Sequence, residues 1–239
     1  EYGQGTLGAS YTSPRYNDDR STLNSWGRQS WGPKMNGALL PYYNDEVREY
    51  SAQPNNVRDF FRDAFRAINS ISLNQGFENG SIRFSYTNNS SESMLPNSDL
   101  QSHNFNLRAV ANLSDKITID SKATYFTQEI NNNNQVTGAQ GLLPNVYRMP
   151  RNVNQNDLKN YQVDNPSTPF EYQSISYASG QWGNPYWILF NDEQSERRNR
   201  FLGFTKIDFQ LTNWLSAFAR VGADITNIDF SKIYKPGHH

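Results

Sequence analysis

Apolar and polar residues alternate with a period of two in several blocks of this chain, and the blocks come in pairs joined by short turns. One block covers residues 104–113 and the next covers residues 117–125, with a turn between them. Because successive side chains of a strand point to opposite faces of a sheet, each block is a predicted strand and each pair a predicted hairpin. Similar pairs flank the turns at 74–80 and 212–214, so the sequence predicts six antiparallel strands.

The connections between these strands alternate between short and long. The long ones are predicted at residues 88–103 and 131–199, and a further long stretch at 13–56 precedes the first clear strand. In an up-and-down sheet every second connection lies at the same end, so the short turns share one end and the long loops the other. This asymmetry is typical of bacterial outer-membrane barrels, with short periplasmic turns and long extracellular loops.

Two interpretations follow from this periodicity. In the first, the chain is all-β and forms part of an antiparallel up-and-down transmembrane β-barrel. In the second, it is a soluble meander or sandwich whose apolar face packs on another sheet. The last predicted strand, residues 215–225, is longer than most strands of soluble domains. Its length and the asymmetry of the loops favour the membrane.

The amino-acid composition excludes several classes of function and of structure. A net charge of -1 and a pI of about 6.4 give no electrostatic footprint for nucleic acid, so no such partner is expected. The absence of cysteine excludes a disulfide scaffold and thiolate metal ligands. The chain has no apolar run of about 18 residues, the length that a membrane-spanning helix needs.

No constellation of catalytic residues can be assembled. His103, His238 and His239 lack the spacing of metal ligands, and no Ser-His-Asp or Cys-His arrangement is present. The segment from Gly3 to Gly8 matches a dinucleotide-binding pattern, but no helical period follows it, so these glycines more plausibly mark bends or close approaches. We therefore predict no enzymatic activity, no metal and no cofactor.

The long stretch 131–199 holds the candidate ligand-binding residues. Trp182, Tyr186 and Trp187 crowd around Gly183 and Pro185, and aromatic rings beside amide groups suit carbohydrate or peptide ligands. The alternative is that these rings anchor the loop or lie in an interfacial aromatic girdle. A short helical turn is predicted within 156–161.

Several strings, in order along nearly the whole chain, resemble the SusC/RagA family of TonB-linked outer-membrane proteins. They are "EYGQGTLG", "SWGPKMNG", "NNVRDFF", "RFSYTN" followed by "MLPNSDL", "RMPRNV", "NPYWILF" and "RNRFLG". The resemblance implies a 22-stranded barrel closed by a plug. It also implies import of oligosaccharides or peptides across the outer membrane of Bacteroidota-type bacteria, with a SusD-like surface lipoprotein as partner and energy from TonB.

The resemblance covers an early part of such a barrel, without the plug or the TonB box. We therefore expect residues 1–239 to belong to a longer polypeptide, with a possible seventh strand at residues 1–12. The TonB system would act through the missing plug region. Arg197, Arg198 and Arg200 would meet lipopolysaccharide phosphates or pair with nearby acidic residues.

The resemblance to this family also implies which residues lie on each face of the predicted strands. The residues expected to face lipid are Ile117, Ile119, Leu215, Ala217, Ala219 and Val221. Those expected to face the lumen, where polar side chains contact substrate or plug, are Arg108, Asp120, Lys122, Arg220 and Asp224. The alternative function is a secreted or surface-exposed glycan-binding β-sandwich module, with Trp182, Tyr186 and Trp187 as its sugar platform.

Overall fold

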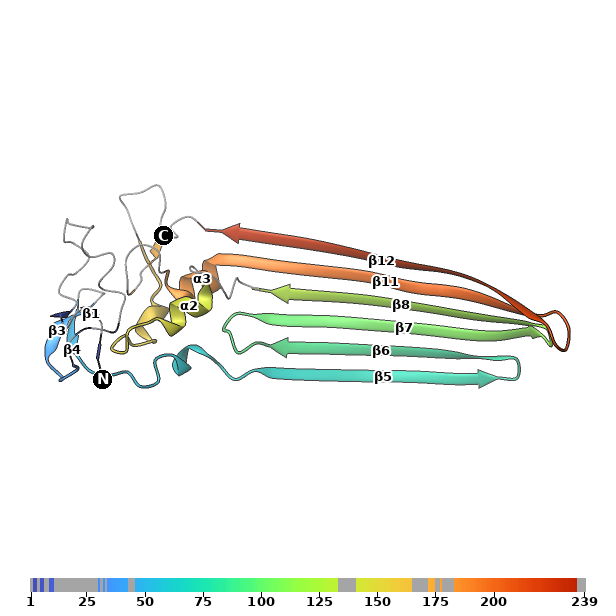
Figure 1. Cartoon of the computed structure of the whole chain (residues 1–239), viewed down its shortest axis with the longest axis horizontal. Coiled ribbons are helices and arrows are strands. Elements are labelled where there is room, and N and C mark those ends of the chain that lie inside the picture. Colours follow the sequence, from blue (N-terminus) through green and yellow to red (C-terminus); the bar gives the residue numbers. More distant parts are fainter. Residues whose placement is uncertain are drawn as a thin grey trace.

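Six long antiparallel strands form the body of the molecule and lie side by side in the order in which they follow one another along the chain (Figure 1). The structure is a computed structural model that describes residues 2–3, 5–6, 9–10, 30, 32, 34–42, 46–132, 141–164, 172–174, 177 and 183–235. The strands are β5 (Phe65–Phe77), β6 (Gly80–Glu92), β7 (Asp99–Ser114), β8 (Ile117–Asn131), β11 (Asp192–Gln210) and β12 (Ser216–Tyr234). The predicted all-β, antiparallel architecture is confirmed.

The connections lie as the alternation of short and long predicted, because the three short turns share one end of the sheet (Figure 1). These turns are residues 78–79, 115–116 and 211–215. The β6–β7 connection and the described residues between β8 and β11 lie at the opposite end of the sheet (Figure 1). A register shift between Asn112 and Ser114 marks a β-bulge just before the second turn.

The predicted loop at 88–103 is wrong in its extent. Strand β6 continues to Glu92 and β7 begins at Asp99, so only residues 93–98 connect them. Asn88 pairs with His103 in the ladder although both side chains are polar. The hydrogen bonds of a ladder join backbone groups, so the strands continue where the apolar alternation has stopped. For the same reason β11 begins at Asp192, inside the predicted loop 131–199.

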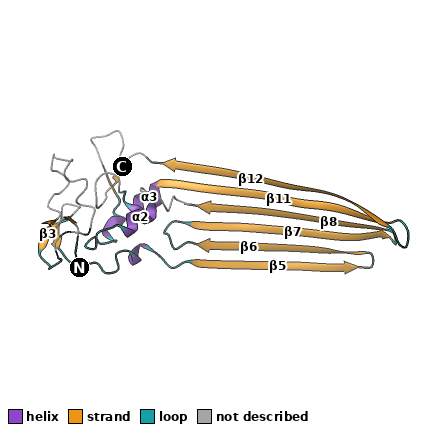
Figure 2. Ribbon diagram, in the orientation of Figure 1, coloured by secondary structure: helices purple, strands orange, loops and turns teal. Residues whose placement is uncertain are grey.

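The shorter elements gather beyond one end of the sheet (Figure 2). They are β1 (Gly5–Thr6), β2 (Ala9–Ser10), β3 (Leu39–Pro41), β4 (Val47–Glu49), η1 (Arg58–Phe60), α2 (Leu142–Tyr147), η2 (Asp157–Lys159), β9 (Gln162–Asp164), β10 (Tyr172–Ser174) and α3 (Pro185–Asn191). The helical turn expected within 156–161 is present as η2. A long strand across residues 1–12 is not found in the described part, where β1 pairs only with β2.

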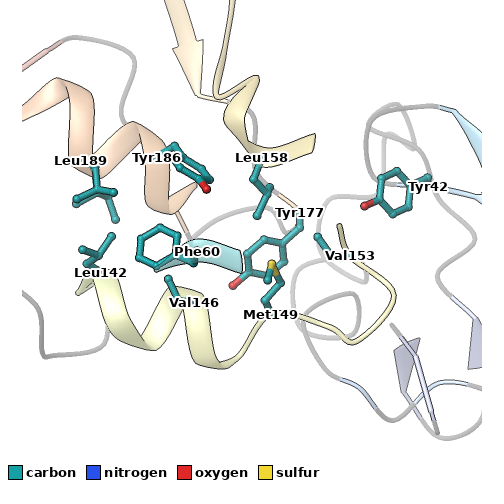
Figure 3. Close-up of a cluster of buried hydrophobic side chains, with 11 residues drawn as sticks. Tyr42, Phe60, Leu142, Val146, Met149, Val153, Leu158, Tyr177, Tyr186 and Leu189 are labelled. Atoms are coloured by element: carbon teal, nitrogen blue, oxygen red, sulfur yellow. The ribbon is translucent and has the colours of Figure 1, made fainter. Parts of the chain in front are cut away.

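The apolar core lies among these shorter elements and not on the sheet. We call the described residues of 34–64, 141–164 and 183–191, together with Tyr177, the cap. Its buried side chains meet around α2, α3 and η2 (Figure 3); they are Tyr42, Phe60, Leu142, Val146, Met149, Val153, Leu158, Tyr177, Tyr186, Ile188 and Leu189. No helix among the described residues is long and apolar enough to cross a membrane.

Hydrogen bonds tie the cap to the end of the sheet. The Asn97 amide, in the β6–β7 connection, donates to the Leu189 carbonyl oxygen of α3 at 2.8 Å. Arg62 donates to the carbonyl oxygens of Ser93 and Ser98 at 2.9 and 3.1 Å. Helix α3 also runs directly into β11, which begins at Asp192. The cap is therefore anchored both by the chain itself and by the neighbouring connection.

Replacing Gly80 by alanine is expected to weaken the β5–β6 hairpin. A Cβ atom there would stand 2.2 Å from the backbone oxygen of Val110, whereas a Cβ at Gly76 would meet nothing within 4 Å. Overpacking of this kind typically destabilises by about 1–3 kcal/mol. We expect Gly80→Ala to lower the midpoint of denaturant unfolding, and Gly76→Ala to leave it near the wild-type value. Equal midpoints for the two variants would contradict the close approach.

Candidate functional site

The register assigns each strand residue to one of two faces of the sheet, because residues directly opposite each other share a face. On one face the side chains nearest the short turns are mostly apolar, and we call this region the apolar band. Its large members are Ile71, Leu73, Phe77, Ile82, Phe84, Tyr86, Phe105, Leu107, Ile117, Ile119, Tyr125, Phe201, Ile207, Phe209, Val221 and Ile225. No described residue covers the band: Val221 is 73% exposed and Leu73 63%.

The band ends abruptly at the side of the cap. Its last row crosses all six strands in direct register and consists of Ile71, Tyr86, Phe105, Tyr125, Phe201 and Ile225. The next row on the same face is polar on every strand; it consists of Asn69, Asn88, His103, Thr127, Asn199 and Asn227. We call the first the aromatic row and the second the amide row. One step along the strands thus changes the face from apolar to polar.

The tyrosines of the aromatic row bridge this boundary. The Tyr86 hydroxyl is hydrogen bonded to Nδ1 of His103 at 2.8 Å, and the Tyr125 hydroxyl donates to Oδ1 of Asn199 at 3.2 Å. The Tyr86 ring also packs on Phe105, with ring centroids 4.8 Å apart. Each tyrosine therefore keeps its ring in the band and its hydroxyl among the amides, as such rings do at an apolar–aqueous interface.

The opposite face, which we call the polar face, carries all five residues predicted to face a lumen. Arg108 donates two hydrogen bonds to the Asp120 carboxylate, at 3.0 and 2.8 Å. Lys122 lies directly opposite Arg108. Asp224 accepts from Arg200 at 2.8 and 2.6 Å, a partner that the sequence did not indicate.

Five of the six residues predicted to face lipid lie on the other face, in the apolar band. Ile117, Ile119, Ala217, Ala219 and Val221 all share it, while Leu215 lies in the turn before β12. The three arginines at the start of β11 form ion pairs. Arg197 pairs with Glu129 at 3.2 Å, Arg198 with Glu196 at 3.2 Å and Arg200 with Asp224.

The predicted sugar platform lies partly outside the described residues, because Trp182 is not among them. Tyr186 and Trp187 lie on α3 and are 4% and 1% exposed. The Tyr186 ring packs edge-on against Phe60, with centroids 5.5 Å apart, and burial raises the pKa of its phenol. Both rings are packed into the cap and offer no open face to a ligand. Their burial favours the anchoring role that the sequence left as the alternative.

Tyr42 and Asp157 connect two stretches of the cap, residues 34–64 and residues 141–164. The Tyr42 hydroxyl donates to Asp157 at 3.1 Å and accepts from the backbone N–H of Asn154 at 2.8 Å. Arg48 also donates to Asp157, and its guanidinium lies 4.8 Å from the centre of the Tyr42 ring. Burial opposes the charge on Arg48, but its hydrogen bonds to Asp157 and Glu46 leave its pKa raised.

The pair Gly3 and Tyr50 packs the first described residues against the cap. A Cβ at Gly3 would stand 2.4 Å from the Tyr50 hydroxyl oxygen, so the glycine does mark a close approach. Burial raises the pKa of Tyr50 to about 12, against the opposing effect of a hydrogen bond from the Gly3 backbone.

Removing the charge of Asp157 is expected to loosen the cap without affecting the sheet. Asp157→Asn weakens the bonds from both Tyr42 and Arg48, and hydrogen bonds to charged groups contribute about 1.5–3 kcal/mol each. Hydrogen exchange of the backbone in 141–164 should therefore accelerate. Glu46→Gln is the matched control, because Glu46 also pairs with Arg48 but its side chain is 52% exposed, and an exposed pair contributes about 1 kcal/mol at most. Equal acceleration in both variants would contradict the role of Asp157.

Both edges of the sheet are open in the described structure. Strand β5 pairs only with β6, and β12 pairs only with β11. Among the described residues, no group of three or more histidine, aspartate or glutamate side chains is placed to hold a metal ion. No family model matches the chain, and no curated protein matches its sequence. The two faces of the sheet, its open edges and the cap are therefore the features on which a function has to be argued.

Proposed function

We propose that this chain forms part of the wall of an outer-membrane β-barrel and works as part of a SusC/RagA-like, TonB-dependent importer. The apolar band would face lipid and the polar face would line the lumen. The cargo would be an oligosaccharide or a peptide. A SusD-like surface lipoprotein would be the partner at the loop end, and TonB would supply energy.

The observation that carries this proposal is the apolar band with its abrupt upper limit. On β11 the band runs from Phe201 to Phe209, a length of about 27 Å at about 3.4 Å per residue. With the usual tilt of about 40°, this length projects to about 21 Å along the barrel axis, close to the apolar band of about 25 Å in known barrels. The aromatic row stands where such barrels carry an aromatic girdle.

The opposite limit of the band supports the same orientation. Trp214 lies in the turn between β11 and β12 and is 83% exposed. Leu113 and Leu211, beside the short turns, are 63% and 55% exposed. A large aromatic ring at the end of an apolar face suits the second membrane interface, because its amphipathic indole is favoured at the level of the headgroups.

The open edges support closure by further strands. In lipid, an unpaired backbone N–H or C=O group costs several kcal/mol, so a sheet that spans a membrane has to close on itself. Strands β5 and β12 each have one unpaired side over 13 and 19 residues. Single-chain bacterial barrels have at least eight strands. We therefore propose that the six strands belong to a larger barrel, which in the SusC/RagA family has 22 strands.

The cap would then lie on the cell surface. It stands at the end opposite the short turns, which are periplasmic in outer-membrane barrels (Figure 1). Its buried side chains come from three separate stretches of the chain and from Tyr177; Phe60, Leu142 and Leu189 represent the three stretches. A packed cap gives the extracellular end a rigid surface on which a lipoprotein partner can dock.

The glycan-binding sandwich receives less support. A sandwich buries its apolar face against a second sheet, and no described residue covers the apolar band. A soluble monomer rarely leaves more than a few hundred Å² of contiguous apolar surface exposed. In addition, the two described residues of its sugar platform, Tyr186 and Trp187, are buried.

Fractionation of the native cells tests the proposal. We expect the polypeptide with the sequence "SWGPKMNG" to be in the outer membrane, to have a mass near that of a complete importer and to change its gel mobility on boiling. A SusD-like lipoprotein should copurify with it. A soluble species of 27.4 kDa, the mass of this chain, would contradict the proposal and return attention to the glycan-binding module.

A further inference from the structure

We propose that the polar face binds an acidic oligosaccharide through a stripe of cations that crosses the sheet. The stripe consists of Arg83, Arg108, Lys122, Lys206 and Arg220, one residue from each of the five neighbouring strands β6, β7, β8, β11 and β12. Neighbouring strands lie about 4.8 Å apart, so the stripe extends over about 19 Å. This inference names the cargo class of the importer proposed above and rests on that function.

The two faces of the sheet differ in charge although the whole chain is nearly neutral. On the polar face, the six strands carry nine lysine and arginine residues against five aspartate and glutamate residues. The face with the apolar band has only Arg197 as a cation and five carboxylates, all outside the band; they are Glu92, Asp99, Glu129, Glu193 and Asp229. The positive excess thus belongs to the polar face.

Like charges stand directly opposite each other at three of the four steps between the strands of the stripe; at the step between β8 and β11, Lys206 lies opposite Asp120 and Lys122 opposite Phe204. Arg83 faces Arg108, and Arg108 faces Lys122 on its other side. Lys206 faces Arg220. Like charges in this position destabilise a sheet. The arrangement therefore weakens the sheet on its own, and an anion bound across the stripe would relieve the repulsion.

The sheet itself neutralises only two cations of the stripe. Asp120 pairs with Arg108 at 2.8 Å and Asp208 pairs with Lys206 at 2.7 Å. Within the described residues, Arg83 and Lys122 form no ion pair, and both are exposed. Arg220 forms no direct ion pair there either, although its charge acts on Asp120; its guanidinium lies 3.9 Å from the centre of the Phe204 ring. Three cations therefore remain available to a ligand.

The surroundings of the stripe favour a carbohydrate over a peptide. On β5 to β8, most neighbouring positions of the polar face carry short hydroxyl and amide side chains, which donate and accept hydrogen bonds as sugar hydroxyls require; they include Ser72, Ser85, Asn106, Asn112, Thr118 and Thr124. On β11 and β12 the neighbours are Phe204 and Phe218, whose rings lie beside Arg220 and Lys206. Four of them already bond in two pairs, since Thr124 donates to Asn106 at 2.7 Å and Thr118 donates to Asn112 at 3.0 Å. Carboxylate or sulfate groups on the sugar would meet the cations, with the arginine guanidinium suited to bidentate contact.

Binding is best measured by calorimetry on the detergent-solubilised full-length protein with four probes of similar length. They are hexagalacturonate, a chondroitin sulfate hexasaccharide, neutral maltohexaose and hexaglutamate. We expect the two acidic oligosaccharides to bind with an affinity that falls as salt increases. If neutral maltohexaose bound as tightly as the acidic oligosaccharides, the proposal that the cations select acidic sugars would be wrong. Tighter binding of hexaglutamate would reassign the stripe to acidic peptides.

The variant Arg83→Gln/Lys122→Gln removes two unpaired cations of the stripe. We expect about a tenfold to hundredfold loss of affinity for the acidic oligosaccharides. The matched control is Arg66→Gln/Lys232→Gln, which removes one arginine and one lysine from the same face outside the stripe. An equal loss in the control would overturn the stripe as the site.

Stability gives a second readout that separates misfolding from loss of a site. Because Arg83→Gln/Lys122→Gln removes like-charge neighbours, its thermal midpoint should equal or exceed that of the wild type. A lower midpoint would contradict the argument from repulsion. Binding in detergent does not depend on where the protein resides in the cell. If the protein is soluble and binds acidic oligosaccharides, the importer is refuted and the stripe remains supported as a binding site. If it is an outer-membrane protein that does not bind them, the stripe is refuted and the importer remains supported.

Discussion

An arginine at position 219 is expected to prevent stable assembly of the sheet in a bilayer. Ala219 lies in the middle of the apolar band, directly opposite Ile207. In transmembrane barrels a lipid-facing arginine near the midplane destabilises by about 2–4 kcal/mol. We expect Ala219→Arg to lose the heat-modifiable gel band, or to unfold at a clearly lower denaturant concentration, when the protein is refolded into phosphatidylcholine vesicles.

Ser216→Arg is the control on the same strand. Ser216 belongs to the polar face, where Arg220 is already present, so an added arginine remains in water. Its unfolding midpoint should stay near that of the wild type. Equal tolerance of both substitutions would contradict the assignment of the two faces, and equal damage from both would point to a sheet buried on each side.

Replacing Phe60 by alanine is expected to unfold the cap while the sheet persists. The Phe60 side chain is 1% exposed and packs edge-on against Phe61 and Tyr186, with ring centroids 5.3 and 5.5 Å apart. Truncation of a buried phenylalanine costs about 3–5 kcal/mol. Hydrogen exchange should become rapid in α2 and α3, and limited proteolysis should cut the cap before the sheet.

Tyr147→Ala provides the control within the same cap. Tyr147 lies on α2, is 60% exposed and approaches Phe61 with ring centroids 6.3 Å apart. Its loss should change exchange in the cap only slightly. If Phe60→Ala also removed protection from β7 and β8, the cap and the sheet would form one cooperative unit, and the separation described above would be wrong.

The sequence was a good guide to the sheet wherever one face is apolar. Ala219 and Val221 alternate with Arg220 and Asp224, and the register places the two sets on opposite faces as expected. The guide failed above the aromatic row. The face with the apolar band becomes polar there, while the other face carries scattered apolar residues such as Ile68, Ile228 and Phe230, so no single alternation continues. The pair Asn88 and His103 continues the ladder without any such signal, which is why the connection was expected to be far longer than it is.

The burial of residues in the cap could not be predicted from the sequence, for a different reason. Tyr186 and Trp187 have the composition of a ligand platform, but their exposure depends on segments far away along the chain. Phe60 lies more than a hundred residues before Tyr186 and still packs against its ring. Likewise, Asp157 meets Tyr42 and Arg48 across more than a hundred residues. Only the folded arrangement shows that these rings are buried.

The stripe of cations shows how register adds information to composition. A net charge of -1 gave no indication of a nucleic-acid partner. The cross-strand pairing nevertheless brings Arg83, Arg108 and Lys122 into one row, since each lies opposite the next. These residues are separated by 25 and 14 positions along the chain, so no local sequence pattern could reveal the row. Charge that is balanced over the whole molecule can still be concentrated on one face.

The contact of the apolar band with lipid can be measured residue by residue along β12. Because the chain has no cysteine, single cysteines at positions 217–225 can each carry one environment-sensitive fluorophore in vesicles that contain nitroxide-labelled phospholipid. Our account predicts strong quenching by the lipid label at odd positions, such as Ala219 and Val221, and weak quenching at even ones, such as Arg220 and Asp224. Uniform quenching, or none at any position, would contradict the membrane-facing band.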